Sequence, residues 1–260
     1  MMVPLPPRHR HRRRQRRLFG LHQVEFHGVN LRVTVTKRAA EVDQWVSEVV
    51  HNNRLNLHNL IVGLDIEWHP CLAGEHNPVA TLQLCVGKTC LIFQLLHRDY
   101  TPHSLLAFLA NPQFTFVGVG VGDDAQKLLR DHGLVVENVA DLRWVGAGVY
   151  RSERFMRMGL KRMAWEVVGM VMEKPLEVTL SDWDSNTLTF RQIEYASIDA
   201  FVSSEIGIKL FISLQRVTGT DQKVACSIHV RFNPCFAIFH RSVSITVLSF
   251  FIKVNAALDE

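Results

Sequence analysis

Two carboxylates close an apolar, strand-forming run at residues 61–68. Asp65 and Glu67 stand two positions apart with Ile66 between them. Because side chains along a strand alternate between its faces, both acids point to one side and Ile66 points away. Two like charges held together at the end of a buried strand are costly unless a cation lies between them, and hard oxygen ligands favour Mg²⁺ or Mn²⁺. A strand that ends in solvated acids is the alternative interpretation.

Two further stretches carry acids in positions that suit the same chemistry. The apolar residues 114–119 run through a glycine-rich turn into Asp123 and Asp124 at the start of a helix, where the helix dipole favours negative charge. Near the end of the chain, Tyr195 and Asp199 are one helical turn apart and share a face. Taken alone, this last pair could equally be a half-exposed surface feature.

The segments that must position these residues predict an α/β domain. Residues 23–36 indicate a hairpin, and residues 37–50 have the apolar spacing of a helix. The strand of Asp65 precedes two short apolar runs, residues 79–86 and 89–95, joined by Gly87 and Lys88, so we expect three adjacent antiparallel strands. Residues 188–214 predict a long helix, and residues 215–260 show no pattern that assigns them.

The charge of the chain is unevenly placed. Residues 8–17 hold seven arginines and no acid, and because the whole chain nets +4, the remainder is slightly acidic. An arginine block of this kind is typical of a nuclear-import signal or a nucleic-acid-binding arm. We expect residues 1–23 to be a basic, disordered tail and the protein to be nuclear, with an organelle or the cytoplasm as alternatives. The longest apolar run near the end of the chain, residues 245–252, is too short to span a bilayer, so we expect no membrane partner.

The cysteines are odd in number, form no Cys-x-x-Cys pair and stand mostly in apolar runs. We therefore expect reduced, buried thiols, in preference to disulfides or a zinc site. They are Cys71, Cys85, Cys90, Cys226 and Cys235.

Three motifs in this order and spacing resemble the DEDD-superfamily 3′–5′ exonucleases of the tyrosine-bearing branch. The first is Val-Gly-Leu-Asp-Ile-Glu-Trp at residues 62–68. The second is Val-Gly-Val-Gly-Val-Gly-Asp-Asp-Ala-Gln-Lys-Leu-Leu at residues 117–129, and the third is Tyr-Ala-Ser-Ile-Asp-Ala at residues 195–200. Gly-Leu-Lys at 159–161 and Ser-Asp-Trp at 181–183 also match. The chain is most similar to Werner-syndrome-type exonuclease domains, with RNase D as a more distant relative.

The resemblance implies an RNase H-like fold, with a mixed five-stranded sheet flanked by helices, over an exonuclease domain at residues 24–214. It implies hydrolytic release of nucleotides from a 3′ end with two Mg²⁺ or Mn²⁺ ions. By position, the metal ligands carried over are Asp65, Glu67, Asp124 and Asp199, and Tyr195 is the residue that orients the attacking water. Aligning on residues 127–129 selects Asp124 in place of its neighbour Asp123.

DNA is the expected substrate, with RNA 3′-end processing of the RNase D type as the alternative. A catalytically silent nucleic-acid-binding protein on the same fold is a third reading. All four carboxylates and the tyrosine are present, which argues against it, because an inactive site has no reason to keep so costly a cluster.

Overall fold

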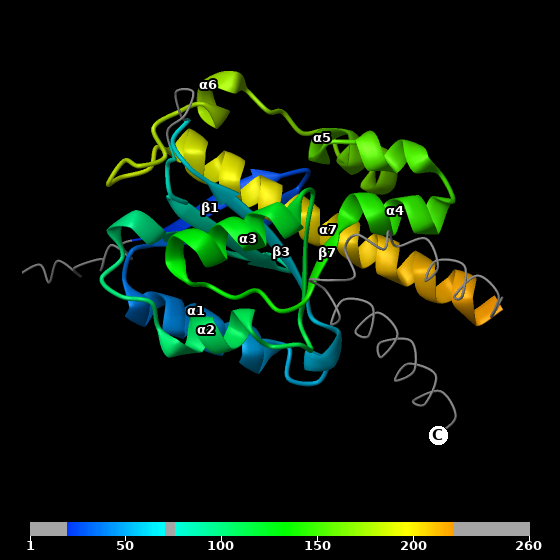
Figure 1. Cartoon of the computed structure of the whole chain (residues 1–260), viewed down its shortest axis with the longest axis horizontal. Coiled ribbons are helices and arrows are strands. Elements are labelled where there is room, and N and C mark those ends of the chain that lie inside the picture. Colours follow the sequence, from blue (N-terminus) through cyan, green and yellow to red (C-terminus); the bar gives the residue numbers. More distant parts are fainter. Residues whose placement is uncertain (1–19, 71–75, 221–260) are drawn as a thin grey trace, which may run out of the picture.

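The computed structural model describes residues 20–70 and 76–220, and in them a single mixed sheet has the strand order β1-β2-β5-β4-β3-β6-β7 (Figure 1). The pairs β1–β2, β5–β4 and β4–β3 are antiparallel. The pairs β2–β5, β3–β6 and β6–β7 are parallel. The α/β class is therefore confirmed. The strands are β1 (Leu21–Phe26), β2 (Val29–Thr36), β3 (Ile61–Glu67), β4 (Thr81–Val86), β5 (Thr89–Gln94), β6 (Thr115–Gly118) and β7 (Val139–Asp141).

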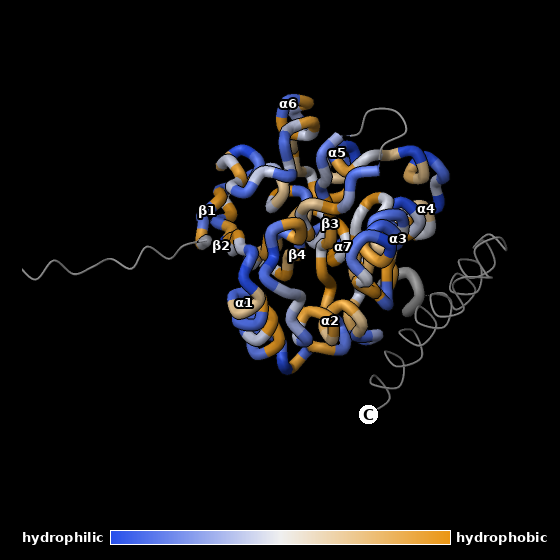
Figure 2. Tube along the Cα trace, turned by 60° about the vertical axis from the view of Figure 1, so that its left-hand side comes forward, coloured by the Kyte–Doolittle hydropathy of each residue, from blue (hydrophilic) through white to orange (hydrophobic). Residues whose placement is uncertain are grey.

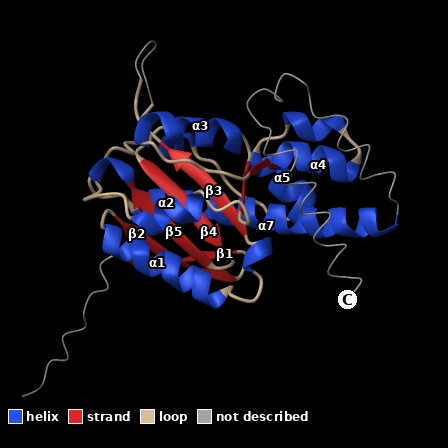
Figure 3. Ribbon diagram, turned by 60° about the horizontal axis from the view of Figure 1, so that its bottom comes forward, coloured by secondary structure: helices blue, strands red, loops and turns tan. Residues whose placement is uncertain are grey.

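Helices cover both faces of the sheet. On one face lie α1 (Ala39–Asn52), α2 (His103–Leu109) and α3 (Val121–His132), whose apolar side chains join those of β3 and β4 in one core (Figure 3). The long helix α7 (Phe190–Thr220) crosses the other face, with α4 (Leu142–Tyr150) and α5 (Leu160–Met163) packed beside it. A π-helical turn, Ala164–Val168, continues α5, and the short α6 (Leu176–Thr179) precedes α7. Figure 2 shows that the central strands between these layers are mostly apolar.

The sheet has seven strands where five were predicted. The hairpin expected at residues 23–36 is present as β1 and β2, and it forms part of the sheet. Its second strand pairs with β5 from Arg32 opposite Thr89 to Thr36 opposite Phe93. An edge strand has unpaired N–H and C=O groups that gain hydrogen bonds from a further strand, and the hairpin provides them for β5.

The three adjacent antiparallel strands β3, β4 and β5 are confirmed, and they correct the prediction about cysteines. The tight connection at Gly87, whose φ is +53°, sets a register in which Cys85 stands directly opposite Cys90. These two sulfurs form a disulfide, so the expectation of free thiols is wrong for this pair. The other three cysteines, Cys71, Cys226 and Cys235, lie outside the described residues.

The described elements extend slightly beyond the expected boundaries of the domain. The first strand begins at Leu21, inside the segment expected to be a tail, and α7 continues to Thr220. The arginine block at residues 8–17 and the segment from 221 onward lie outside the described residues. None of the helices in the described residues is both long enough and apolar enough to cross a membrane.

Candidate active site

Asp65 and Glu67 end β3 on the face of the sheet that carries α7. Alternation along the strand places Leu64 and Ile66 on the opposite face, where both are buried in the core under α1, α2 and α3. The two acids are only partly covered. The strand therefore separates its apolar anchors from its acidic residues, as its sequence predicts.

Gly63, on the same face of β3 as the two acids, explains how α7 comes so close to them. A Cβ atom built at this position would lie 1.8 Å from the carbonyl oxygen of Ala200, so the strand and the helix backbone are in direct contact. Only glycine permits such an approach. Because Ala200 touches the strand here, the preceding residue, Asp199, is held beside Asp65. Glycine inside a strand is a sequence signal for close backbone approach, and it was not used in the sequence analysis.

Asp124 comes from the first turn of α3, directly after β6. Strand β6 lies parallel to β3, so their carboxyl ends meet at one edge of the sheet. Gly120, with a φ of +82°, makes the sharp turn from β6 into the helix. Of the two neighbouring acids, Asp123 is exposed and Asp124 is partly buried, near enough to Asp65 for the two charges to repel. The structure thus brings Asp124 to the other acids.

Tyr195 and Asp199 lie one turn apart on α7, and both are buried. Asp199 is 1% exposed, and the ring of Tyr195 packs against the buried indole of Trp183 with 6.1 Å between the ring centroids. Trp183 donates its indole N–H to the carbonyl oxygen of Thr179, which fastens the Ser-Asp-Trp loop to α6. The surface-pair interpretation of Tyr195 and Asp199 is therefore wrong.

Lys174 is a site residue that the sequence analysis missed. It stands in the extended segment before α6, and its ammonium nitrogen lies 2.5 Å from Oδ2 of Asp199 and 5.4 Å from the ring centroid of Tyr195. A third of its side chain remains exposed. An isolated lysine in an irregular segment carries no periodicity or motif, so no sequence signal separated it from an ordinary surface residue.

Burial and mutual repulsion raise the pKa values of the acids. Burial raises the pKa of Asp65 to about 7, with a further contribution from Asp199, while Lys174 opposes the shift. Burial and the charge of Asp65 raise the pKa of Glu67 to about 9 and that of Asp124 to about 8. The pKa of Asp199 is also raised by burial, although its ion pair with Lys174 acts the other way. One ammonium group does not neutralise four carboxyl groups, so further positive charge is needed to ionise all of them.

The second oxygen of Asp199 is well suited to such a charge. Its Oδ1 atom is buried and has no hydrogen-bond partner in the described structure. A buried, unpartnered carboxylate oxygen is costly, and a cation removes the cost. As the side chains stand, no three acidic, histidine or cysteine residues within the described ranges are grouped tightly enough to enclose an ion. A donor set of carboxylate oxygens alone would favour Mg²⁺ or Mn²⁺ over zinc.

Two aromatic residues at the rim have different environments. Trp68, which directly follows the acidic strand, is partly exposed, and the ammonium of Lys127 lies 5.0 Å from the centroid of its ring. Nδ1 of His69 lies 3.5 Å from a carboxylate oxygen of Asp182, in the loop before α7.

A mixed sheet flanked by helices, with acids gathered where parallel strands end, defines an RNase H-like nuclease domain. The chain belongs to the 3′–5′ exonuclease domain family, whose profile matches residues 35–216. The predicted membership is thereby confirmed.

Individual relatives agree with this assignment. Human exonuclease 3′-5′ domain-containing protein 2 is 33% identical over 159 residues, which are 59% of this chain and 25% of that protein. The mouse bifunctional 3′-5′ exonuclease/ATP-dependent helicase WRN is 32% identical over 153 residues, 58% of this chain and 11% of that protein. The chain thus spans a small part of either relative. The crystal structure of Escherichia coli RNase D shares the fold, with a TM-score of 0.57 and 21% identity over 71% of this chain and 45% of that one.

Proposed function

We propose that this chain is a divalent-metal-dependent exonuclease that removes nucleotides from the 3′ ends of DNA. The observation that supports this best is the buried, unpartnered Oδ1 atom of Asp199 within a cluster of mutually repelling acids. In the proposal, two Mg²⁺ or Mn²⁺ ions are held by Asp65, Glu67, Asp124 and Asp199. Four carboxylates balance the charge of two such ions, which is why a site of this composition favours a pair.

When bound, the ions would lower the pKa of a coordinated water and stabilise the leaving 3′-oxygen. The protein supplies position. Strand β3 and helix α7 hold their acids rigidly because Gly63 locks the two elements together. In this proposal the phenol of Tyr195 donates or accepts a hydrogen bond that keeps the attacking water in line. The partly exposed ring of Trp68 offers a surface on which a terminal base can stack.

RNA is the alternative substrate, because discrimination between the two nucleic acids depends on local contacts to the 2′-hydroxyl. The solved RNase D relative is described as an exoribonuclease, but at 21% identity it supports the fold and not the substrate. A catalytically silent nucleic-acid-binding protein is the alternative from another class. It predicts that the chain binds strands without shortening them.

One digestion experiment separates these possibilities. Single-stranded DNA, duplex DNA and RNA, each labelled at the 5′ end, are incubated with the purified chain in Mg²⁺, in Mn²⁺ or in EDTA. We expect a ladder of shortened DNA products in metal and intact substrate in EDTA. Preferential shortening of RNA would transfer the proposal to RNA, and intact strands in all conditions would leave only the binding function.

We also propose that the protein acts in the nucleus, because residues 8–17 carry seven arginines without an acid. These residues lie outside the described structure. A fluorescent fusion of the full chain should concentrate in the nucleus, and a fusion without residues 1–17 should not. Accumulation of the full-length fusion in an organelle would contradict this proposal.

A further inference from the structure

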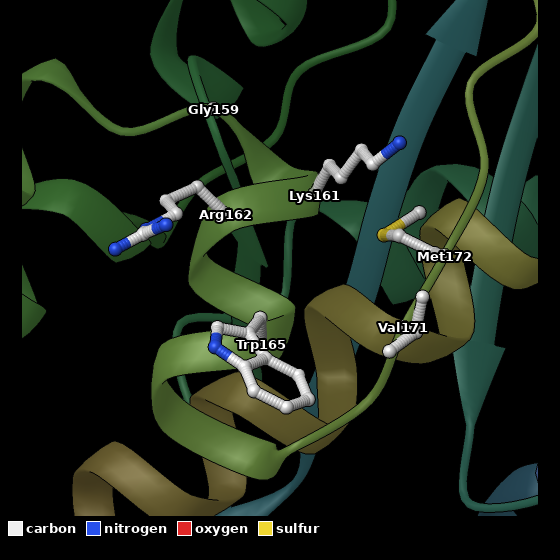
Figure 4. A pocket seen from close by; sticks show the side chains of 6 residues that line it. All are labelled: Gly159, Lys161, Arg162, Trp165, Val171 and Met172. Carbon is white, nitrogen blue, oxygen red and sulfur yellow. The ribbon is translucent and has the colours of Figure 1, made fainter.

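A cavity of about 510 Å³ opens beside the candidate active site, and the proposed reaction does not use it (Figure 4). Figure 4 shows α5 and the π-helical turn after it on one side of the cavity, and the chain of Val171 and Met172 on the other. Its volume falls in the range of cavities that hold small organic molecules. Its lining residues are Gly159, Lys161, Arg162, Trp165, Val171 and Met172.

The walls are apolar and open to solvent. The indole of Trp165 is 56% exposed and Val171 is 57% exposed, whereas Met172 is buried at the base. The wall at Val171 is fixed in place, because Nε2 of His27 lies 2.9 Å from its carbonyl oxygen and 3.1 Å from its amide nitrogen. A large aromatic face exposed over a cavity, with an anchored wall opposite, is suited to a flat apolar group such as a nucleobase.

The rim of the cavity is positively charged. Arg162 and Arg154 share one carboxylate, that of Glu166, so this group of three has a net positive charge. Lys161 has no ion pair among the described residues, and Arg157 is exposed nearby in the chain. With the exposed acids Glu153 and Glu173 also counted, cations outnumber acids here by four to three. Excess cations next to an exposed aromatic ring complement a polyanion that also offers stacking faces, which is the chemistry of single-stranded nucleic acid.

A short piece of chain links the cavity to the acidic cluster. Met172 forms its base, and Lys174, two residues further on, is paired with Asp199. Two residues span at most about 7 Å. The extended side chain of Lys174 adds about as much again, so a strand whose 3′ end lies at Asp199 can reach the cavity within about two to four nucleotides, since successive nucleotides are about 3.4 Å apart in a stacked strand.

We propose that this cavity binds a base of the substrate strand two to four nucleotides from its 3′ end, with Trp165 stacking on the base and Lys161 contacting a neighbouring phosphate. This assignment rests on the proposed nuclease function.

Binding without hydrolysis tests the proposal. The affinity of a 5′-fluorescein-labelled 12-mer of deoxythymidine is measured by anisotropy in EDTA, for the full chain and its variants. Trp165→Ala should weaken binding about tenfold, and Trp165→Phe should restore most of it. Lys161→Ala should weaken binding about threefold, with a smaller dependence on salt. Tyr100→Ala and Lys209→Ala, which remove an exposed aromatic ring and an exposed cation elsewhere, should bind like the wild type.

Abasic sites identify the base concerned. Twelve-mers that lack one base at each of the last five positions are compared with the intact strand. In the wild type, loss of the base at one of the third to fifth positions from the 3′ end should lower the affinity about tenfold. In Trp165→Ala the same abasic site should lower the affinity no further, because the two changes remove the same contact. If the abasic site lowered the affinity equally in the wild type and in Trp165→Ala, the proposal would be overturned.

Hydrolysis separates this inference from the proposed function. With Mn²⁺, Trp165→Ala should raise KM for the 12-mer about tenfold while the hydrolysis of a dinucleotide, too short to reach the cavity, stays at the wild-type rate. A wild-type chain that binds the 12-mer through Trp165 but cleaves nothing refutes the nuclease and keeps the binding site. A wild-type chain that cleaves normally, with Trp165→Ala unchanged in binding and KM, refutes the binding site and keeps the nuclease.

Discussion

The ammonium nitrogen of Lys174 lies 2.5 Å from Oδ2 of Asp199, inside the acidic cluster at the end of β3. Burial alone would lower the pKa of this lysine, but the attraction of Asp199 and Asp65 outweighs it and raises the pKa. Lys174 is therefore charged whenever these acids are. It supplies one of the positive charges that the acids need, at the oxygen next to the one that is left unpartnered.

Replacing Lys174 by methionine should therefore have opposite effects on the metal-free and the metal-bound protein. Without metal, loss of the partner of a buried carboxylate should destabilise the fold by about 1–3 kcal/mol, less than for a fully buried pair because the lysine is partly exposed. Affinity for Mn²⁺ should rise, since the ion no longer competes with the ammonium. Thermal melts in EDTA and calorimetric Mn²⁺ titrations measure both, with Lys209→Met as the control. Unchanged Mn²⁺ affinity in Lys174→Met would show that lysine and metal do not compete.

The pH dependence of stability follows from the raised carboxyl pKa values. In the unfolded chain these acids titrate near pH 4. Folded Asp65, Glu67 and Asp124 keep their protons up to pKa values of about 7, 9 and 8. Between those limits the folded state binds more protons, so the free energy of unfolding falls as pH rises from about 4 to 9.

Urea denaturation in EDTA at pH 5, 7 and 9 measures this fall. Glu67→Gln removes the group that titrates highest and should flatten the decline above pH 7. Excess Mn²⁺ should remove the decline in the wild type, because the cation stabilises the ionised acids. A wild-type protein whose stability rises steadily from pH 5 to 9 in EDTA would contradict the assigned electrostatics.

The neighbouring acids at the start of α3 should differ sharply in importance. Asp124 faces Asp65, whereas Asp123 is exposed. In Mn²⁺, Asp124→Ala should lower kcat by at least about 10³-fold, as should the reference variant Asp65→Asn, because each loses several kcal/mol of transition-state stabilisation. Asp123→Ala should stay within about threefold of the wild type. A reversed order for Asp123 and Asp124 would mean that the register of the second motif is off by one residue.

The sequence motifs predicted which acids gather because strand alternation and helical spacing are local rules. Asp65 and Glu67 share a face through the two-residue period of β3, and Tyr195 and Asp199 through one turn of α7. Fold class and family follow from the same motifs. These local rules do not predict how far apart the elements lie.

The features that sequence reasoning missed depend on which segments and which residues stand opposite each other in the fold. Lys174 reaches Asp199 from 25 residues away, and nothing around it is periodic. The pairing of the first hairpin with β5 depends on which sheet edge is free. The Cys85–Cys90 disulfide depends on the register across a two-residue turn, which composition and cysteine count do not reveal.

A substitution at Gly63 tests how closely β3 and α7 must pack. In Gly63→Ala the added methyl group meets the Ala200 carbonyl at 1.8 Å, so α7 must move away from β3. We expect a loss of about 3 kcal/mol or more in unfolding free energy and, because Asp199 moves with the helix, a loss of activity. Gly122→Ala, where the methyl group meets nothing within 4 Å, should change stability by less than about 1 kcal/mol. Urea midpoints of both variants decide this, and equal stability of the two would refute the close contact.

Tyr195 tests whether the site belongs to the tyrosine-bearing branch of the family. Its ring is buried against Trp183, and burial together with the charge of Asp199 raises the pKa of its hydroxyl to about 12. The phenol is therefore protonated at neutral pH and acts as a hydrogen-bonding group. In the proposed mechanism it orients water without serving as the final acceptor of the proton.

Tyr195→Phe keeps the ring and its packing on Trp183 and removes only this hydroxyl. Positioning and proton-transfer effects of this type are worth roughly 10²–10⁴ in rate. We expect kcat on single-stranded DNA to fall within that range, while Mn²⁺ affinity and DNA binding in EDTA stay within about twofold of the wild type. Single-turnover kinetics isolates the chemical step, and Tyr100→Phe, a change to an exposed tyrosine, is the matched control. An unchanged rate in Tyr195→Phe would make this tyrosine a packing residue and remove the assignment to the tyrosine branch.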